Sequence, residues 1–169
     1  MIVVADTSPL NYLIWVECDR LFHDVYGLIV VPAGVMQELD HARAPSPVRA
    51  WLARLPGWVE VQRTVAAPDP GLSDLGLGEQ EAIQLAEEQH ADLLLIDERK
   101  GRQAAKRRGL RTTGTLGVLL AAGQLHLTDP ETVYRRLLAE TNFRTSPGLE
   151  AQFLELIRSS FGAAHELFP

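Results

Sequence analysis

Four acidic residues lie at or near the ends of apolar segments, where a soluble domain more often carries uncharged residues. They are Asp6 after the run Met1–Ala5, Glu38 between Val35 and Leu39, Glu79 after Gly78, and Asp97 after the run that ends at Ile96. Carboxylates in such positions are expected to gather at one edge of a sheet. Ionised carboxylates crowded into a partly dry site need a proton or a cation to offset their charge. The pattern therefore predicts a metal-carboxylate site.

The donor set indicates which metal such a site would bind. All four acids offer oxygen ligands, whereas the five histidines are scattered without ligand spacing and the single cysteine, Cys18, provides no thiolate cluster. Hard oxygen ligands favour Mg²⁺ or Mn²⁺ over zinc. An ion of this kind activates a bound water and stabilises developing negative charge, which is what phosphodiester hydrolysis requires.

Each acid also has a purely structural explanation. Asp6 and Asp97 each precede an expected helix and could cap it. Glu38 could be an ordinary exposed helix residue, and Glu79 could complement the positive end of its helix. The hypothesis of a metal site depends on the four acids occurring together.

Basic residues are concentrated in one part of the chain. The net charge of −6 argues against a protein that coats nucleic acid through its overall charge. However, seven of the 16 Lys and Arg residues fall between Arg99 and Arg111. Arg99, Arg102 and Lys106 project on a common side of the helix expected there, which suits phosphate contact near Asp97. Basic residues late in that helix could instead complement its dipole and keep the surface soluble.

Short apolar runs alternate with helical patterns along the chain. Strands are expected at residues 2–5, 28–31, 58–61, 91–96 and 110–112, and helices from Ser8, from Pro32, through Trp51, and at 78–90, 98–109 and 115–122. This alternation predicts an α/β protein, a three-layer α/β/α sandwich with a central, mainly parallel sheet of four to five strands plus C-terminal helices. Ligands bind such sheets outside the carboxyl ends of the strands, where Asp6 and Asp97 are expected.

The helix expected at 78–90 begins with two glutamates, and its periodicity separates them. At about 100° per residue, Ala82, Ile83 and Ala86 share the side that carries Glu79, whereas Glu81 turns toward solvent. Glu79 is therefore the predicted third acid of the site.

Length and composition predict a single domain, since 169 residues with 46% hydrophobic content suit one core. The N-terminal run is too short for a signal peptide and no apolar run approaches the ~20 residues of a membrane span, so we expect a cytoplasmic protein without membrane contact. The last expected helix, from about Gly148, carries an apolar stripe made of Leu149, Phe153, Leu156, Ile157 and Phe161. The stripe packs on the same domain or forms a dimer or partner surface.

Four sequence blocks occur in a characteristic order. They are Asp-Thr-Ser-Pro-Leu, Val-Pro-x-x-Val-x-x-Glu-Leu, Gly-Glu-x-Glu-Ala-Ile-x-Leu-Ala, and Leu-Leu-Ile-Asp-Glu-Arg-Lys-Gly-Arg followed by Thr-Gly-Thr-Leu-Gly. Together they resemble the PIN-domain nucleases, in particular prokaryotic PIN-like proteins related to the ribonuclease toxins of toxin–antitoxin pairs. The resemblance covers roughly residues 1–125, the expected catalytic domain, with a weaker echo around Asn142-Phe143-Arg144. Residues 126–169 are then an expected helical extension packed on the same domain.

The resemblance implies specific roles for the residues in these blocks. Asp6, Glu38, Glu79 and Asp97 would be the catalytic acids and metal ligands, with Glu98 as an auxiliary ligand. Ser8 would support the metal or the scissile phosphate, and it joins Arg99, Arg102 and Lys106 as the expected substrate-binding set. The implied activity is a Mg²⁺- or Mn²⁺-dependent endoribonuclease acting on RNA. An antitoxin protein is a candidate partner, and a homodimer is the expected assembly.

Two other functions stay open from the residues alone. Asp-Thr-Ser after a first parallel strand resembles the haloacid-dehalogenase phosphatases, in which Asp6 would be phosphorylated and Lys100 would bind phosphate. That class carries a second aspartate two residues after its nucleophile, where this chain has Ser8. The other alternative is a catalytically inactive PIN-like binding module with a vestigial acidic site.

Overall fold

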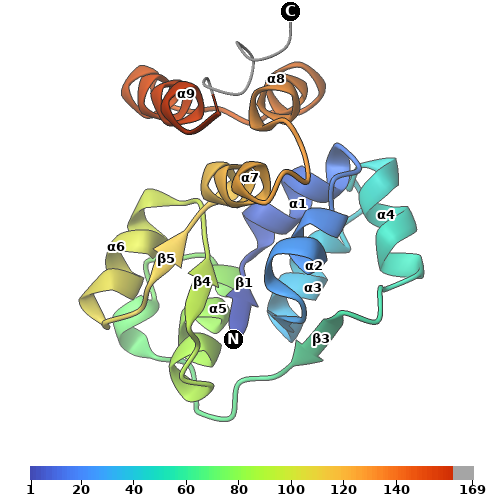
Figure 1. Cartoon of the computed structure of the whole chain (residues 1–169). Helices are drawn as coiled ribbons and strands as arrows, with labels where there is room; N and C mark the ends of the chain where they lie inside the picture. Colours follow the sequence, from blue (N-terminus) through green and yellow to red (C-terminus); the bar gives the residue numbers. More distant parts are fainter. Residues whose placement is uncertain (162–169) are drawn as a thin grey trace, which may run out of the picture.

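The computed structural model describes residues 1–161, the last by its backbone alone. Residues 162–169 of the predicted extension and the Phe161 side chain of the predicted stripe therefore lie outside the described part. The sheet contains β1 (Val3–Ala5), β2 (Ile29–Pro32), β3 (Val59–Gln62), β4 (Leu93–Leu95) and β5 (Thr112–Thr113). Its order is β3-β2-β1-β4-β5, and every neighbouring pair is parallel. The predicted α/β/α sandwich is confirmed (Figure 1).

Helices connect the strands and extend beyond the last one. They are α1 (Thr7–Trp15), α2 (Arg20–Tyr26), α3 (Ala33–Leu39), α4 (Ser46–Ala53), α5 (Leu77–Glu88), α6 (Arg99–Arg107), α7 (Thr115–Gln124), α8 (Pro130–Glu140) and α9 (Pro147–Phe161). The sequence did not predict α2, a short helix that buries only Leu21 and Phe22. The last strand also begins later than predicted, because Leu110 and Arg111 precede the two-residue β5. Between β3 and α5, residues Pro70–Leu72 form a short 3₁₀ helix.

The two faces of the sheet bury different side chains. Alternate residues of a strand point to opposite faces, so Val3 and Ala5 of β1 join one apolar cluster while Val4 joins the other. The second cluster holds α5 and α6 against the sheet through residues such as Ile83 and Ala105. Because both faces are covered, the inner strands are apolar along their whole length, as parallel sheets require.

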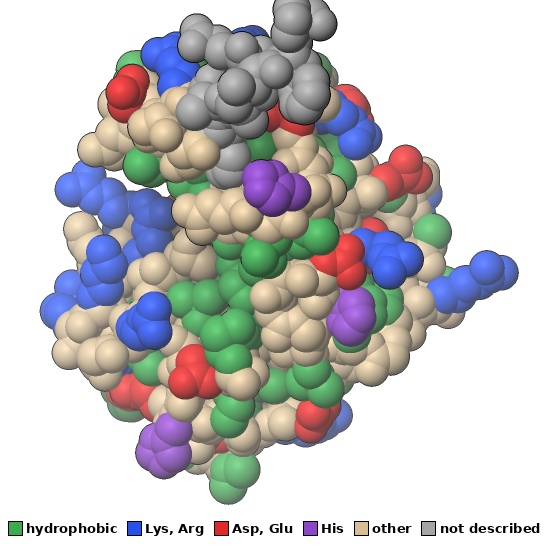
Figure 2. Space-filling view, in the orientation of Figure 1, with side chains coloured by type: hydrophobic (Ala, Val, Ile, Leu, Met, Phe, Trp, Pro, Cys, Tyr) green, Lys and Arg blue, Asp and Glu red, His purple; other side chains and the backbone are tan. Residues whose placement is uncertain are grey.

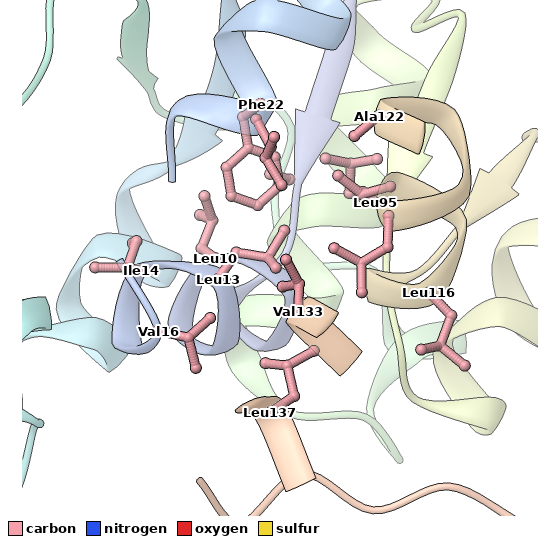
Figure 3. Close-up of a cluster of buried hydrophobic side chains, with 14 of the residues drawn as sticks. Leu10, Leu13, Ile14, Val16, Phe22, Leu95, Leu116, Ala122, Val133 and Leu137 are labelled. Atoms are coloured by element: carbon pink, nitrogen blue, oxygen red, sulfur yellow. The ribbon is translucent and has the colours of Figure 1, made fainter. Parts of the chain in front are cut away.

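The larger cluster also includes the C-terminal helices. Figure 3 shows Val133 and Leu137 of α8 beside Leu10 and Leu13 of α1, with Leu116 of α7 nearby. Phe153 and Ile157 of α9 belong to the same cluster. In Figure 1, α7 lies between the sheet and the last two helices, and it contacts both of them. Across residues 1–161, no helix combines the length and the apolar character that crossing a bilayer demands.

The strand order places a change of direction at the centre of the sheet. The chain runs outward from β1 through β2 to β3, and then returns to place β4 on the other side of β1. Crevices at such reversal points are the usual ligand sites of open α/β sheets. Asp6 directly follows β1, and Asp97 lies two residues after the end of β4. The topology therefore brings these two acids to the carboxyl ends of neighbouring strands, at the same edge of the sheet.

Candidate acidic site and adjoining cleft

Asp6 is the most buried of the four predicted acids, with 2% of its surface exposed. It occupies the N-cap position of α1, yet its side chain makes no capping hydrogen bond. Its Oδ1 is buried without a hydrogen-bond partner among the described residues. Burial raises the pKa of Asp6 from 3.8 to about 7, opposed by the Thr7 amide and reinforced by the charges of Glu79, Glu38 and Asp97. The other three acids therefore lie near enough to Asp6 for their charges to act on it.

Glu38 is held by hydrogen bonds at both carboxylate oxygens. The Thr7 hydroxyl donates to its Oε2 at 2.5 Å, and the Gly78 amide donates to its Oε1 at 2.7 Å. Thr7 belongs to the first turn of α1 and Gly78 to the first turn of α5. Glu38 thus links three helices. It binds the residue after Asp6 and the residue before Glu79.

Asp97 is held in a similar way by the first residue of α7. The amide of Thr115 donates to Oδ1 at 2.8 Å, and the Thr115 hydroxyl donates to Oδ2 at 2.6 Å. Burial raises the pKa of Asp97, while these two hydrogen bonds and the charge of Arg102 oppose the rise. The predicted alternative, a cap for the helix that follows, is wrong, because Glu98 is the N-cap of α6 and Asp97 binds the start of α7 instead.

One carboxylate oxygen of Glu79 accepts a hydrogen bond, and the other has no hydrogen-bond partner in the described chain. The Gly76 amide donates to Oε2 at 3.0 Å, so Glu79 does satisfy the start of its own helix. Its Oε1 is buried without a partner in the described chain. Burial raises the pKa of Glu79, the Gly76 hydrogen bond and Lys100 lower it, and Glu98 and Glu38 raise it further. Glu98 is exposed, and its charge acts on both Glu79 and Asp97.

The helical periodicity predicted that Glu81 points into solvent, and this prediction is wrong. It is half-buried, and its Oε2 accepts a hydrogen bond of 2.7 Å from the Gly34 amide at the start of α3. The periodicity of α5 located the core-facing side correctly, but it carried no information about α3, which packs across this helix. Glu81 therefore supports the neighbouring helix, while Glu79 faces the other acids.

Three glycines make room for the acids. A Cβ atom on Gly78 would lie 2.4 Å from Oε2 of Glu38, one on Gly101 would lie 2.5 Å from Oε1 of Glu79, and one on Gly114 would lie 2.4 Å from Oδ1 of Asp97. Such separations exclude a side chain at these positions unless the carboxylates move. The glycines and the threonines Thr7 and Thr115 were not predicted as site residues, although each lies in one of the four sequence blocks.

The donor set suits a hard divalent cation. Its oxygens are carboxylates, two of them buried and without partners, and none of the four acids forms an ion pair with Lys or Arg within residues 1–161. As arranged in the described chain, no three His, Cys, Asp or Glu side chains form a group that could hold an ion. Glu38, Glu79 and Asp97 each accept hydrogen bonds from hydroxyl or amide donors of the protein. Binding a shared ion would require these carboxylates to turn part of their lone pairs toward it.

A cleft of about 690 Å³ opens beside Asp97. Ser8, Arg99, Arg102 and Lys106, the predicted substrate-binding residues, all line it, together with Glu98. Figure 2 shows Lys and Arg side chains gathered over α6 on this side of the molecule. Arg108, later in the same basic stretch, has a structural role instead, because it binds Asp69 at 2.7 Å and Glu87 at 2.9 Å.

Comparison with known proteins gives one family. Residues 2–159 match the family described as DUF3368, PIN domain. The match passes residue 125, where the sequence resemblance was expected to weaken, and includes α8 and most of α9. No curated protein matches the chain.

Proposed function

This chain belongs to the DUF3368 family of PIN domains, a nuclease superfamily, and we propose that it is a divalent-metal-dependent endoribonuclease that cleaves RNA at the acidic site. The observation that carries the proposal is that Oδ1 of Asp6 and Oε1 of Glu79 are buried without hydrogen-bond partners in the described chain, and the charges of Glu79, Glu38 and Asp97 add to the burial that raises the pKa of Asp6. Carboxylates that are partly buried and act on one another's pKa need a positive ligand to remain ionised.

The proposed ligands of the ion are Asp6, Glu38, Glu79 and Asp97, with Glu98 at the exposed edge. When bound, Mg²⁺ or Mn²⁺ would supply an activated water and positive charge for the phosphate oxygens. The Thr7 and Thr115 hydroxyls hold Glu38 and Asp97 in place by hydrogen bonds, and each carboxylate would bind the ion through the lone pairs that these bonds leave free.

The substrate would lie along the cleft beside Asp97. Arg99, Arg102 and Lys106 offer positive charge to the phosphates, and the Ser8 hydroxyl offers a hydrogen bond near the cut. Their charge attracts a polyanion that the protein as a whole, with a net charge of −6, would repel. We further propose that the protein is the toxin of a toxin–antitoxin pair and that it acts in the cytoplasm as a homodimer. An antitoxin would be sought in the product of the neighbouring gene.

The test compares RNA cleavage by the purified protein and by Asp6→Asn and Asp97→Asn in Mn²⁺ or Mg²⁺. We expect cleavage by the wild type and at least a ~100-fold loss in both variants, because each removes a charged ligand. We also expect the metal to raise the melting temperature of the wild type and to raise that of the variants less.

Asp74→Asn is the matched control, because Asp74 is an exposed aspartate in the loop before α5. It should cleave RNA and respond to metal as the wild type does. Equal cleavage by the Asp6 and Asp97 variants would contradict the proposal, and so would a melting temperature that metal leaves unchanged.

A further inference from the structure

Two helices that carry proposed ligands begin without a side chain that caps them. The N-cap residue of α3 is Pro32 and that of α5 is Gly76, and neither has a side chain that can accept a hydrogen bond. The first amides of a helix have no acceptor within the helix, so an N-cap side chain usually accepts one of them. In α3 and α5 that acceptor must come from elsewhere in the fold.

Each helix receives its missing acceptor from the other. The Gly34 amide, the second of α3, donates to Oε2 of Glu81 on α5 at 2.7 Å. The Gly78 amide, the second of α5, donates to Oε1 of Glu38 on α3 at 2.7 Å. In each helix the glutamate lies about one turn after the glycine, so both are on the same side of it. We call these two hydrogen bonds between α3 and α5 the reciprocal cap.

The reciprocal cap requires glycine at both helix starts. A Cβ atom on Gly34 would lie 2.6 Å from Oε2 and 2.8 Å from Oε1 of Glu81, and one on Gly78 would lie 2.4 Å from Oε2 of Glu38. Neither glycine has a positive φ angle, so the helical backbone itself would accept alanine at both positions. The close approach of a carboxylate to the helix start therefore accounts for these glycines.

Only one of the two glutamates belongs to the acidic site. The charge of Glu38 acts on Asp6, and Glu38 is one of the proposed ligands. Glu81 instead lines a separate pocket of about 220 Å³ with Arg63 and Thr64, and none of the four acids lines that pocket. Glu81 thus binds the helix that carries Glu38 from outside the acidic site.

From this geometry we infer that Glu81 is a positioning residue for Glu38. By binding the first turn of α3 to α5, it holds Glu38 next to Gly78 and fixes where the Glu38 carboxylate meets the other acids. The affinity of the site for an ion then depends on a carboxylate that does not contact the ion, as it does for other residues that orient metal ligands. This effect on metal binding rests on the proposed function, whereas the effect on the position of Glu38 does not.

The first test uses the metal-free protein. Glu81→Ala removes the acceptor of the Gly34 amide, whereas Glu81→Gln keeps an oxygen that can accept it and removes only the charge. The readout is the NMR signal of the Gly78 amide proton, which reports the hydrogen bond to Glu38. We expect Glu81→Ala to move this signal toward that of a free amide and Glu81→Gln to leave it near the wild-type position. The glutamine variant controls for local effects of a substitution in α5.

The second test measures Mn²⁺ binding without RNA, through the electron paramagnetic resonance signal of the free ion. Glu81→Ala should weaken the Kd about tenfold, the lower end of the effect of residues that orient metal ligands. Glu81→Gln should bind Mn²⁺ like the wild type. If Glu81 were itself a ligand, the glutamine variant would bind as weakly as the alanine variant. If Glu81 had only a structural role, Glu81→Ala would lower the melting temperature and leave the Kd unchanged.

The third test changes Gly34 and leaves Glu81 in place. In the wild-type background, the new Cβ of Gly34→Ala would displace the Glu81 carboxylate, and we expect the melting temperature to fall by about 2–4 °C. In the Glu81→Ala background the space is free and alanine favours a helix more than glycine does, so the same change should raise the melting temperature. Equal effects in the two backgrounds would show that Gly34 and Glu81 do not interact.

Glu88→Ala is the matched control. Glu88 also lies on α5 and also accepts backbone amides, those of Val65 and Ala66, but it lies at the other end of the helix. Its loss should lower the melting temperature while leaving the Gly78 signal and the Kd for Mn²⁺ unchanged. The inference is overturned if Glu81→Ala leaves the Gly78 signal at its wild-type position, if it leaves the Kd of a wild type that binds Mn²⁺ unchanged, or if Glu81→Gln behaves like Glu81→Ala.

The two proposals can fail separately. If the wild-type protein binds no Mn²⁺ while Glu81→Ala still moves the Gly78 signal, the positioning of Glu38 holds and the metal-dependent function is wrong. If the wild type binds Mn²⁺ and cleaves RNA while Glu81→Ala changes neither the Gly78 signal nor the Kd, the function holds and the positioning role of Glu81 is wrong.

Discussion

At the scale of single residues, the burial of Asp6 is a cost of building the acidic site. Its carboxyl group has a pKa of about 7 in the folded protein, compared with 3.8 for an ordinary aspartate. The unfolded chain therefore releases this proton at a lower pH than the folded protein does. Between about pH 4 and pH 7 the folded state binds more protons, so the contribution of Asp6 to stability falls as pH rises, and the full penalty remains above pH 7.

Asp6→Asn should remove this penalty. A shift of about three units corresponds to at most ~4 kcal/mol, so we expect the variant to gain stability at pH 8 and little at pH 4. Urea unfolding in EDTA at the two pH values measures the difference, with Asp74→Asn as the control. A gain of the same size at both pH values would show that the carboxyl group is not responsible.

The four acids could be proposed from the sequence because each stands out against apolar neighbours or helical periodicity. Their supporting residues could not be predicted in this way. Thr115 lies 18 positions after Asp97, and Thr7 is 31 positions before Glu38. Hydroxyl residues at helix starts are common for local reasons, so nothing in the sequence marked these two as partners of distant carboxylates.

At the scale of elements, the N-terminal ends of α5, α6 and α7 converge on the acids. Each end brings a glycine against a carboxylate: Gly78 against Glu38, Gly101 against Glu79 and Gly114 against Asp97. Amide groups at helix starts are good donors to negative charge, and two of these helices use them, through Gly78 and Thr115. The glycines permit this close approach because they carry no side chain.

Gly114→Ala tests this close approach. The new Cβ would lie 2.4 Å from Oδ1 of Asp97, so the carboxylate must move and its hydrogen bonds to Thr115 must weaken. We expect a loss of about 1–3 kcal/mol in stability from overpacking, together with a marked loss of RNA cleavage. Urea unfolding and cleavage assays measure the two effects.

Gly57→Ala provides the comparison, because a Cβ there would meet nothing within 4 Å. It should leave both properties unchanged. Normal cleavage by the Gly114 variant would mean that the position of the Asp97 carboxylate has no influence on the reaction.

At the scale of the whole molecule, α8 and α9 close one side of the core, and α9 with the segment before it forms one wall of the cleft. Phe153 is 2% exposed and packs on Tyr134 with ring centroids 5.1 Å apart. The same helix contributes Leu149 and Leu156 to the cleft. We therefore propose that residues 126–161 fold as one unit with the catalytic part.

Phe153→Ala should destabilise the whole protein by about 3–5 kcal/mol, the usual cost of removing a buried aromatic side chain. Unfolding followed by circular dichroism and by tryptophan fluorescence should shift together in a single transition. Glu155→Ala, which changes an exposed residue of the same helix, should have little effect. Two separate transitions, with only the minor one shifted, would contradict folding as one unit.

The sequence by itself determined the α/β class and the type of most elements, and it singled out the four acids that we propose as ligands. Those features follow from local periodicity and composition, which act over a few residues. Only the tertiary structure decided the strand order, the binding of Glu81 to α3, the pairing of Thr7 and Thr115 with distant acids, and the placement of α9 across from α6. These depend on contacts between residues tens of positions apart, where packing of whole elements selects the neighbours and no short sequence pattern records the choice.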